Sequence, residues 1–453
     1  MEWFKKIKHI THLMKQVDFK ELSQISEKID LPRIMKSVGE LNDDQLKGLT
    51  KLLTEKAKKG QHKLPPIDGD FYEYDLKLTF EERAIQMKVR NFMETEVEPI
   101  ANEYWKRAEF PMEIIPKLAK LNISGVAYEG YGCPNLSFVM EGVIAEEIAR
   151  VDVSISTFFG VHSGLAMGSI YLCGSDAQKE EWLPKMQEMK AIGAFGLTEP
   201  NVGSGVAGGM ETTCKKVGDE WILNGQKKWI GNATFADVII IWARDIDSNQ
   251  VKGFLVKKGN PGYKAEKIED KMALRTVQNA LITITDCKIP ESDRLQKANS
   301  FRDTAKVLRM TRAGVAWQAL GCGRGAYESA LKYTKKREQF GKPIAKFQLI
   351  QNHLVEMLAN LTAMKAMVYR LSELQDQGLL TDEQASLAKV FCSMRTRDVV
   401  SRAREVMGGN GILLEYDVAR FVADAEAIYS YEGTKEINTL IVGRAITGYS
   451  AFA

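Results

Sequence analysis

The sequence predicts an α+β fold in which helical regions stand on both sides of a central β region. Between residues 80 and 190, apolar residues recur mostly at helical spacing, as in FEERAIQMKVRNFMETEVEPIANEYW. From about 193 to 300 the pattern changes to short β-branched runs separated by turn residues. From 301 onward the helical period returns, so we expect helices, then a sheet, then helices along the chain.

The composition limits the class of protein. A chain of 453 residues can bury a large core and should divide into two or three domains. With 45% hydrophobic residues and a formal charge of +3, it suits a soluble protein with no general nucleic-acid footprint. Its six cysteines lack paired spacing and its histidines form no HxxxH pair, which predicts a reducing compartment and no metal site.

The first 65 residues form a compositionally separate segment, which we interpret as a helical N-terminal extension. They carry 14 Lys or Arg against 9 Asp or Glu, whereas the whole chain carries 62 against 59. Apolar and basic residues alternate at helical spacing over residues 1–17, which would suit a helix on an anionic membrane surface. Packing on the protein itself or on a sister subunit is the favoured alternative.

Three domains are expected after a Pro-rich linker at 62–70, HKLPPIDGD. They are a helical domain over 75–190, a β domain over 193–300 and a helical bundle over 301–453. In the last of these, apolar residues step by 4, 3, 4, 3, 4 and 3 along one helix face: Ile350, Leu354, Met357, Leu361, Met364, Val368 and Leu371.

No targeting signal is evident. The start of the chain lacks a signal-type apolar core, no run of 18 apolar residues occurs, and the chain ends in Ala-Phe-Ala rather than a peroxisomal tripeptide. We therefore expect a cytoplasmic protein.

Glu432 is the candidate catalytic base, because it is a lone carboxylate beside an apolar stretch, just ahead of a helix start. Gly433 and Thr434 follow it and would open the helix KEINTLIVGRAI. The alternative is an ordinary loop entering a helix, with Thr434 as N-cap.

Four other segments accompany this one: FGLTEPNVGSG (195–205), QKKWIGN (226–232), KKREQFGKPIAKFQLIQ (335–351) and REVMGGNGILLEY (404–416). In this order and at these separations, the five segments resemble the acyl-CoA dehydrogenase and oxidase family of flavoproteins. The likeness runs from about residue 75 to the end and is greatest to the short-chain acyl-CoA oxidase and glutaryl-CoA dehydrogenase branches. It implies a helical N-terminal domain, a central β domain and a C-terminal four-helix bundle.

The resemblance also implies the chemistry. Family members remove a proton from the carbon next to a thioester carbonyl while the neighbouring carbon gives a hydride to N5 of FAD, leaving a trans-2-enoyl-CoA. Glu432 takes the place of the base, and its backbone N–H would face the thioester oxygen. Burial and substrate binding should raise the pKa of this carboxyl toward the working pH.

Several residues match family positions around the flavin. Thr198 and Ser204 match residues that approach the flavin and its pyrophosphate, although PNVGSG read alone could be an ordinary loop. Gly205 replaces the aspartate usual in relatives, which puts flavin affinity in doubt. Trp229 matches the aromatic beside the ring, and its alternative is a tryptophan in the β core. Gly231 replaces a threonine that bonds N5, leaving space that could admit oxygen, unless it is only a turn glycine.

Other matching residues would reach FAD across a subunit boundary. Arg337 and Phe340 match residues on the neighbour's diphosphate and adenine, with Gln348 close behind, and the alternative is a solvated basic helix end. Gly408 and Gly409 would let the backbone approach the cofactor, and Thr434 would contact the flavin. The resemblance therefore implies FAD sites between subunits and a homotetramer.

Two further residues concern the substrate. Arg312 matches an arginine near the base and the CoA chain, and it could equally pair with an acid on the bundle surface. Ser156 stands where glutaryl-CoA dehydrogenases hold the distal carboxylate with an arginine, so we expect a neutral, short acyl-CoA. The electron acceptor would be an electron-transferring flavoprotein, or O2 in an oxidase. A non-catalytic relative and an enzyme for acyl groups on a carrier protein remain as alternatives.

Overall fold

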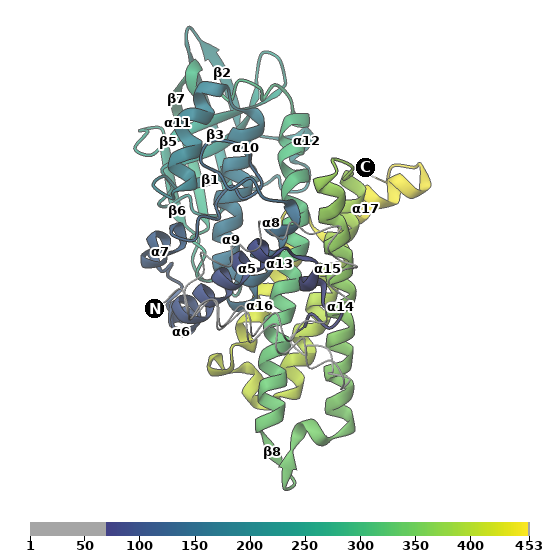
Figure 1. Ribbon diagram of the computed structural model, residues 1–453. Helices are drawn as coiled ribbons and strands as arrows, with labels where there is room; N and C mark the ends of the chain where they lie inside the picture. The colour runs from purple at the N-terminus through teal and green to yellow at the C-terminus, as the bar shows by residue number, and fades with distance from the viewer. Residues whose placement is uncertain (1–68, 452–453) are drawn as a thin grey trace, which may run out of the picture. The chain divides into compact units, whose positions relative to one another are not determined.

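The structure, a computed structural model, describes residues 69–451 (Figure 1), so the predicted extension over 1–65, including residues 1–17, lies outside the described residues. The first part of the described chain is helical, as predicted. Its elements are η1 (Tyr74–Lys77), α5 (Phe80–Phe92), the π-helix η2 (Met93–Val97), α6 (Glu98–Arg107), η3 (Met112–Ile114), α7 (Ile115–Ala119), α8 (Phe138–Val151), α9 (Val153–Phe159), the π-helix η4 (Gly160–Ala166), α10 (Met167–Cys173) and α11 (Asp176–Gln187).

Helix starts in this region follow from local capping. Thr79 and Glu82 form a capping box in front of α5, in which each side chain accepts the other residue's backbone N–H. Ser175 and Gln178 do the same in front of α11. The segment Val153–Cys173 is long and apolar enough to cross a membrane by composition alone, but 83% of its apolar window is buried, so it is a core segment of this fold.

A seven-stranded sheet forms the central β region. Its strands are β1 (Gly193–Gly196), β2 (Thr213–Val217), β3 (Glu220–Ile230), β4 (Val238–Asp245), β5 (Val251–Lys257), β6 (Tyr263–Lys267) and β7 (Ala280–Pro290). The order is β1-β4-β2-β3-β7-β6, with β5 paired to β4. Strand β4 is buried along almost its whole length, which explains its continuous apolar run VIIIWA rather than an alternating pattern. The short elements α12 (Val206–Gly209) and η5 (Glu291–Asp293) flank the strands.

Four helices form the C-terminal bundle: α13 (Phe301–Lys336), α14 (Gln348–Asp376), α15 (Asp382–Val406) and α16 (Val418–Ser430). The predicted stripe on α14 packs into this bundle, with Met357, Leu361, Met364, Val368 and Leu371 buried. The hairpin β8 (Glu338–Gln339) and β9 (Lys342–Pro343), with η6 (Ile344–Lys346), connects α13 to α14. The helices η7 (Gly408–Ile412) and η8 (Leu414–Tyr416) connect α15 to α16, and α17 (Lys435–Thr447) follows.

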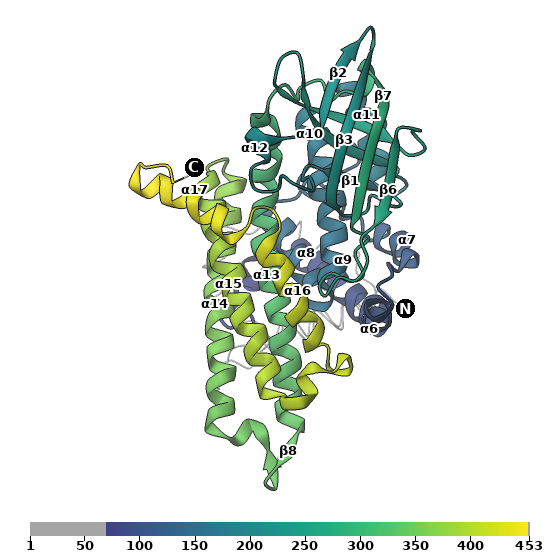
Figure 2. The ribbon, with the colours of Figure 1, turned by 180° about the vertical axis from the view of Figure 1, so that it is seen from behind.

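The bundle has two ends that matter for function. Figures 1 and 2 show the sheet and α17 beside one end of the bundle, whereas the β8–β9 hairpin lies at the opposite end. Helix α8 of the first helical region packs along α13, so the helical regions share one apolar core that includes Val143 and Trp317.

Candidate active site

Glu432 lies in the short turn between α16 and α17. The turn contains two consecutive residues in the left-handed region, Glu432 with φ 51° and Gly433 with φ 87°. A left-handed glutamate costs about 1–2 kcal/mol, and such strain often accompanies functional positions. Thr434 is the N-cap of α17 and accepts the Ile437 N–H at 3.3 Å. The alternative of a capped helix entry is therefore true of Thr434, but it leaves the strained glutamate unexplained.

The carboxyl of Glu432 is half-buried against α13. Its Oε2 accepts a hydrogen bond from the Thr311 hydroxyl at 2.9 Å. Burial raises the pKa of Glu432 above its ordinary value, and the Thr311 hydrogen bond and the charges of Arg312 and Lys389 offset part of this rise. A raised pKa is the direction that a general base working near neutral pH needs.

Lys389 of α15 supports the same turn from the other side. Its side chain is fully buried, and its ammonium group donates to the carbonyl oxygens of Tyr429 at 2.9 Å and Gly433 at 2.7 Å. Burial lowers the pKa of Lys389 to about 8, against the opposing effect of Glu432 and Glu436.

Thr198 begins the predicted flavin loop and is tied to the end of β3. Its hydroxyl donates to the Lys228 carbonyl at 2.6 Å, and the Lys228 N–H donates back to the Thr198 carbonyl at 2.8 Å. The buried pair Glu199–Lys227, at 2.8 Å, anchors the loop. Glu199 also accepts the backbone N–H groups of Glu211 and Thr212, so both ends of the loop are held.

Between these anchors, the loop exposes Ser204 and Gly205. Gly205 has an ordinary φ of −84°, and a Cβ there would meet only Val202, at 3.9 Å. Neither the backbone nor the neighbours require glycine at this position. The exposed backbone of the loop fits the anion-binding role that the resemblance implies.

Trp229 lies at the end of β3, where the pairing with β7 shifts between Lys227 and Ile230. It has φ 69° and a side chain that is 55% exposed, so the alternative of a tryptophan in the β core is wrong. Asn279 donates to the Trp229 carbonyl at 3.2 Å and is itself held by Lys271 at 2.6 Å. A large, exposed aromatic on a strained, anchored backbone suits a flat cofactor stacked against it.

Gly231 adjoins the π-helix η4. A Cβ at Gly231 would meet Val161 at 3.4 Å, Val277 at 3.6 Å and Asn279 at 4.0 Å, all ordinary contacts. Its φ is not positive, so a turn conformation does not require glycine here. The missing side chain therefore leaves open a small space that a threonine would fill.

A second group of predicted cofactor residues lies at the opposite end of the bundle. Arg337 caps α13, Phe340 is 91% exposed at the β8–β9 tip with φ 52°, and Gln348 begins α14. Gly408 and Gly409 begin η7 at that end, and a Cβ on either would meet nothing within 4 Å. A cavity of about 680 Å³ there is lined by residues that include Arg337, Met407 and Asn410.

The two groups are far apart in one chain. On α15, Lys389 contacts the turn that carries Glu432, and Val406 ends the helix next to Gly408. Val406 is 17 positions beyond Lys389 along this helix. At 1.5 Å per residue the separation is roughly 25 Å. The structure therefore brings Glu432 and Thr434 together in one turn, but it leaves Arg337, Phe340, Gln348, Gly408 and Gly409 at the other end.

The two predicted substrate residues lie on α13 and α9. Arg312 is largely buried, lies 4.0 Å from Asp382 and influences Glu432, so it pairs weakly with an acid and also adjoins the base. Its Nε has no hydrogen-bond partner among the described residues. Ser156 is 5% exposed in α9, where a serine could not neutralise a buried carboxylate.

Comparisons with known proteins identify the family. Residues 79–209, 194–287 and 301–447 match the N-terminal, middle and C-terminal domains of acyl-CoA dehydrogenase. A 3-(aryl)acrylate reductase of Clostridium sporogenes is 37% identical, over 80% of this chain and 98% of the relative. The CarC subunit of a caffeyl-CoA reductase–Etf complex of Acetobacterium woodii is 35% identical, over 80% and 96%.

A solved structure matches as well. A glutaryl-CoA dehydrogenase from Mycobacterium smegmatis, in complex with FADH2, has a TM-score of 0.83 and 35% identity, covering 85% of this chain and 100% of that one. The fold and the site together define an FAD-dependent oxidoreductase that acts on the CH–CH bond of an acyl-CoA. The chain belongs to the acyl-CoA dehydrogenase family.

The sequence did not reveal four residues that shape this site: Thr311, Lys389, Glu199 and Lys227. Thr311 bonds a residue 121 positions away, and Lys389 bonds one 44 positions away, so no local pattern connects them to Glu432. Glu199 and Lys227 lie in the segments 195–205 and 226–232, and their opposite charges were a usable signal.

Proposed function

We propose that the protein removes the hydrogens from the α and β carbons of a neutral, short acyl-CoA, with Glu432 as the base. The observation that carries the proposal is a strained, half-buried glutamate whose pKa is raised by burial. An ordinary surface carboxylate would be too weak a base for a proton next to a thioester carbonyl. In the related family the glutamate that matches Glu432 is the base, which supports the same assignment.

Each side chain at the site has a separate role in the proposed reaction. Thr311 occupies Oε2 of Glu432 and leaves Oε1 to take the α-proton, which becomes the acid proton of the carboxyl group. FAD, when bound, accepts the hydride from the β carbon. Trp229 would cover the flavin edge and exclude water, while the Thr198–Ser204 loop would offer backbone N–H groups to the pyrophosphate.

We further propose that each FAD lies between two subunits of a homotetramer. The roughly 25 Å between Glu432 and Gly408 within one chain supports this. Arg337 and Phe340 are fully available at the far end of the bundle, as a contribution to a neighbour's cofactor requires. Native mass spectrometry should give four chains with four FAD. Arg337→Met should release FAD, although Arg337 lies far from Glu432 in the same chain. Full retention of FAD in this variant would contradict a site shared between subunits.

The acyl group should be neutral. Ser156 offers no positive charge for a distal carboxylate, although the matched Mycobacterium protein is a glutaryl-CoA dehydrogenase. The names of the two relatives suggest that an aryl-substituted acyl group also belongs among the candidates. Anaerobic flavin reduction should therefore be compared for butyryl-CoA, glutaryl-CoA and 3-phenylpropanoyl-CoA. Rapid reduction by glutaryl-CoA alone would contradict the proposed neutral substrate.

For the electron acceptor we propose an electron-transferring flavoprotein, supported by the relative that belongs to an Etf complex. We also propose a cytoplasmic location, from the composition. The oxidase alternative rests on the space beside Gly231. Stoichiometric peroxide in air would establish an oxidase, and Gly231→Thr should then suppress peroxide while anaerobic flavin reduction persists. Absence of peroxide, with turnover on an artificial acceptor, would exclude it.

A further inference from the structure

Among the residues that the structure describes, the buried cation Lys389 hydrogen-bonds to backbone carbonyls and not to a carboxylate. Within residues 69–451, its Nζ donates to the carbonyl oxygens of Tyr429 and Gly433, at 2.9 and 2.7 Å. Burying an ammonium group without a paired carboxylate is costly, and proteins seldom keep such a group without a purpose. The hydrogen bonds of Lys389 to these two carbonyls therefore indicate a role at this turn.

The carbonyls bracket Glu432 on both sides. Tyr429 lies in the last turn of α16, where carbonyls have no partner within the helix and carry the negative end of its dipole. Gly433 directly precedes the N-cap of α17, and its carbonyl also accepts from Asn438 Nδ2 at 2.8 Å. Both lone pairs of that oxygen are thus occupied, and the turn is fixed to α15 and to α17 at once.

The charges around this turn come from three helices. Arg312 faces it from α13 and Lys389 from α15, while Glu436 of α17 and Glu432 supply the negative charge. Asp382 at the start of α15 lies 4.0 Å from Arg312 and compensates part of that charge. Lys389 is thus the cation in this group that also makes direct hydrogen bonds to the turn that carries the base.

We propose that Lys389 is a positioning residue for Glu432, holding the strained turn by two hydrogen bonds and placing a positive charge beside the base. The charge makes the ionised carboxylate easier to keep in a half-buried site, because an opposite charge nearby favours the charged form. The hydrogen bonds keep a left-handed glutamate from relaxing into an ordinary conformation. This role deepens the proposed function and rests on Glu432 being the base.

Backbone mobility tests the positioning role without any need for turnover. In the FAD-bound protein, Lys389→Met should speed amide hydrogen exchange across 430–435 by about tenfold or more, because two carbonyls lose their donor. Lys88→Met is the matched control, since Lys88 also donates to two carbonyls, those of Lys120 and Leu121, away from the turn. Asn438→Leu removes the other donor to Gly433 and should have a smaller effect of the same kind. Unchanged exchange in Lys389→Met would overturn the proposal.

The pH profile of anaerobic flavin reduction tests the charge. Loss of a cation raises the pKa of Glu432, so the acidic limb of Lys389→Met should move to higher pH. The maximal rate should fall roughly 10- to 100-fold, because the base is misplaced. Lys389→Arg should restore the limb, and Lys88→Met should not move it. An unshifted limb in Lys389→Met would overturn the electrostatic part.

Flavin reduction tests the proposed function, and hydrogen exchange tests the positioning role of Lys389 independently of it. If no acyl-CoA reduces the wild-type flavin, the proposed function fails. The exchange data still decide whether Lys389 positions the turn.

Discussion

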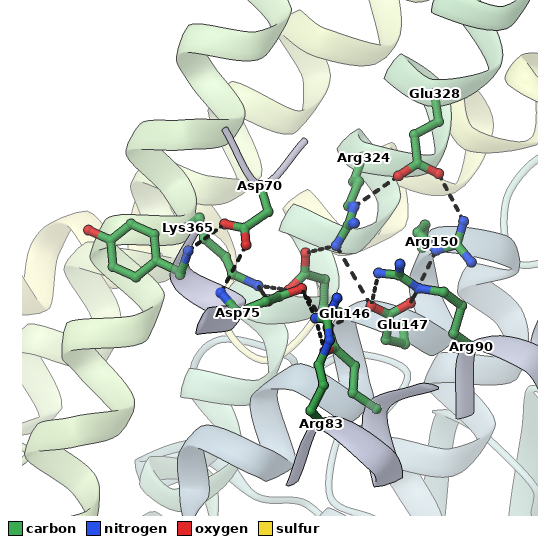
Figure 3. Close-up of polar contacts among 12 residues, drawn as sticks. Asp70, Asp75, Arg83, Arg90, Glu146, Glu147, Arg150, Arg324, Glu328 and Lys365 are labelled. Carbon is green, nitrogen blue, oxygen red and sulfur yellow. Dashed lines mark hydrogen bonds and ion pairs between the residues drawn. The ribbon is translucent and has the colours of Figure 1, made fainter. Parts of the chain in front are cut away.

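Two clusters of buried charge in this protein use the same residue types in opposite ways. One is the network drawn in Figure 3, which links the start of the described chain to α8, α13 and α14. In this network Asp75 contacts Arg83 at 2.7 Å and Lys365 at 3.2 Å, while Glu147 contacts Arg90 at 2.6 Å and Arg150 at 3.2 Å. The other cluster is the turn at Glu432, where the carboxylate meets a hydroxyl and the lysine meets carbonyls.

The pKa shifts follow this difference in pairing. Burial raises the pKa of Glu147, but its hydrogen bond to Arg90 and the charges around it outweigh burial and bring the pKa down to about 2. Asp75 shifts in the same direction, because Lys365 and Arg324 outweigh burial. At Glu432 burial prevails and the pKa rises. Pairing with cations, and not burial alone, therefore separates Glu147 and Asp75 from Glu432, which shares its raised pKa with other buried carboxylates such as Glu141 and Asp424.

The sharpest test of this contrast is Glu432→Gln. We expect the rate of flavin reduction by acyl-CoA to fall about 10²- to 10⁴-fold, because the amide cannot take the α-proton. FAD should remain bound, as the absorbance spectrum will show, since Glu432 is not among the proposed cofactor contacts. Normal bleaching of the variant would mean that another residue is the base.

Breaking the network should affect stability instead. Lys365→Met leaves Asp75 and Glu146 short of a cation and should cost about 3–5 kcal/mol of folding free energy, measured by denaturant titration. The pH dependence of flavin reduction should stay as in the wild type. A shifted acidic limb in this variant would show that the two clusters are coupled.

The two clusters should also respond oppositely to acid. The pKa of Glu147 is lowered from 4.5 to about 2, so its stabilising effect is complete above pH 4.5 and is lost as the pH falls toward 2. The pKa of Glu432 is raised, so its ionised form destabilises the fold at neutral pH. Glu432→Gln should therefore have a higher Tm than the wild type at pH 7, with the difference vanishing near pH 4.5. A lower Tm at pH 7 would contradict the raised pKa.

The smallest expected effect concerns Thr311. Its hydroxyl stabilises the ionised carboxylate of Glu432, so Thr311→Val should raise the pKa of that carboxyl further. The acidic limb of flavin reduction should move up accordingly, while Thr311→Ser keeps the hydroxyl and should leave it in place. A downward shift in Thr311→Val would show that the hydroxyl does not favour the charged form.

Much of the fold was predictable because it follows from local patterns. The 4, 3 stepping from Ile350 to Leu371 marks one buried helix face, and the β-branched runs from 193 to 300 mark strands. The strained turn at Glu432 was predictable only as a helix entry. The exposure of Trp229 was harder to predict, because the local sequence does not show whether a tryptophan at a strand end packs inward or is exposed. In the structure it is 55% exposed.

The partners of the base were not predictable from neighbouring residues. Thr311 lies on α13, Lys389 on α15 and Glu432 in the α16–α17 turn, so only the packing of these three elements brings them together. The network in Figure 3 is similar, because Asp75 and Lys365 are 290 residues apart.

By itself, the sequence determined which segments are helices or strands and which glutamate precedes a helix, because periodicity, capping and turn chemistry act between near neighbours. Only the tertiary structure decided which carboxylates have a pKa lowered by ion pairing, like Glu147, and which have a pKa raised by burial, like Glu432. The reason is physical: desolvation and charge pairing depend on what surrounds a group in space, and chain order does not record that.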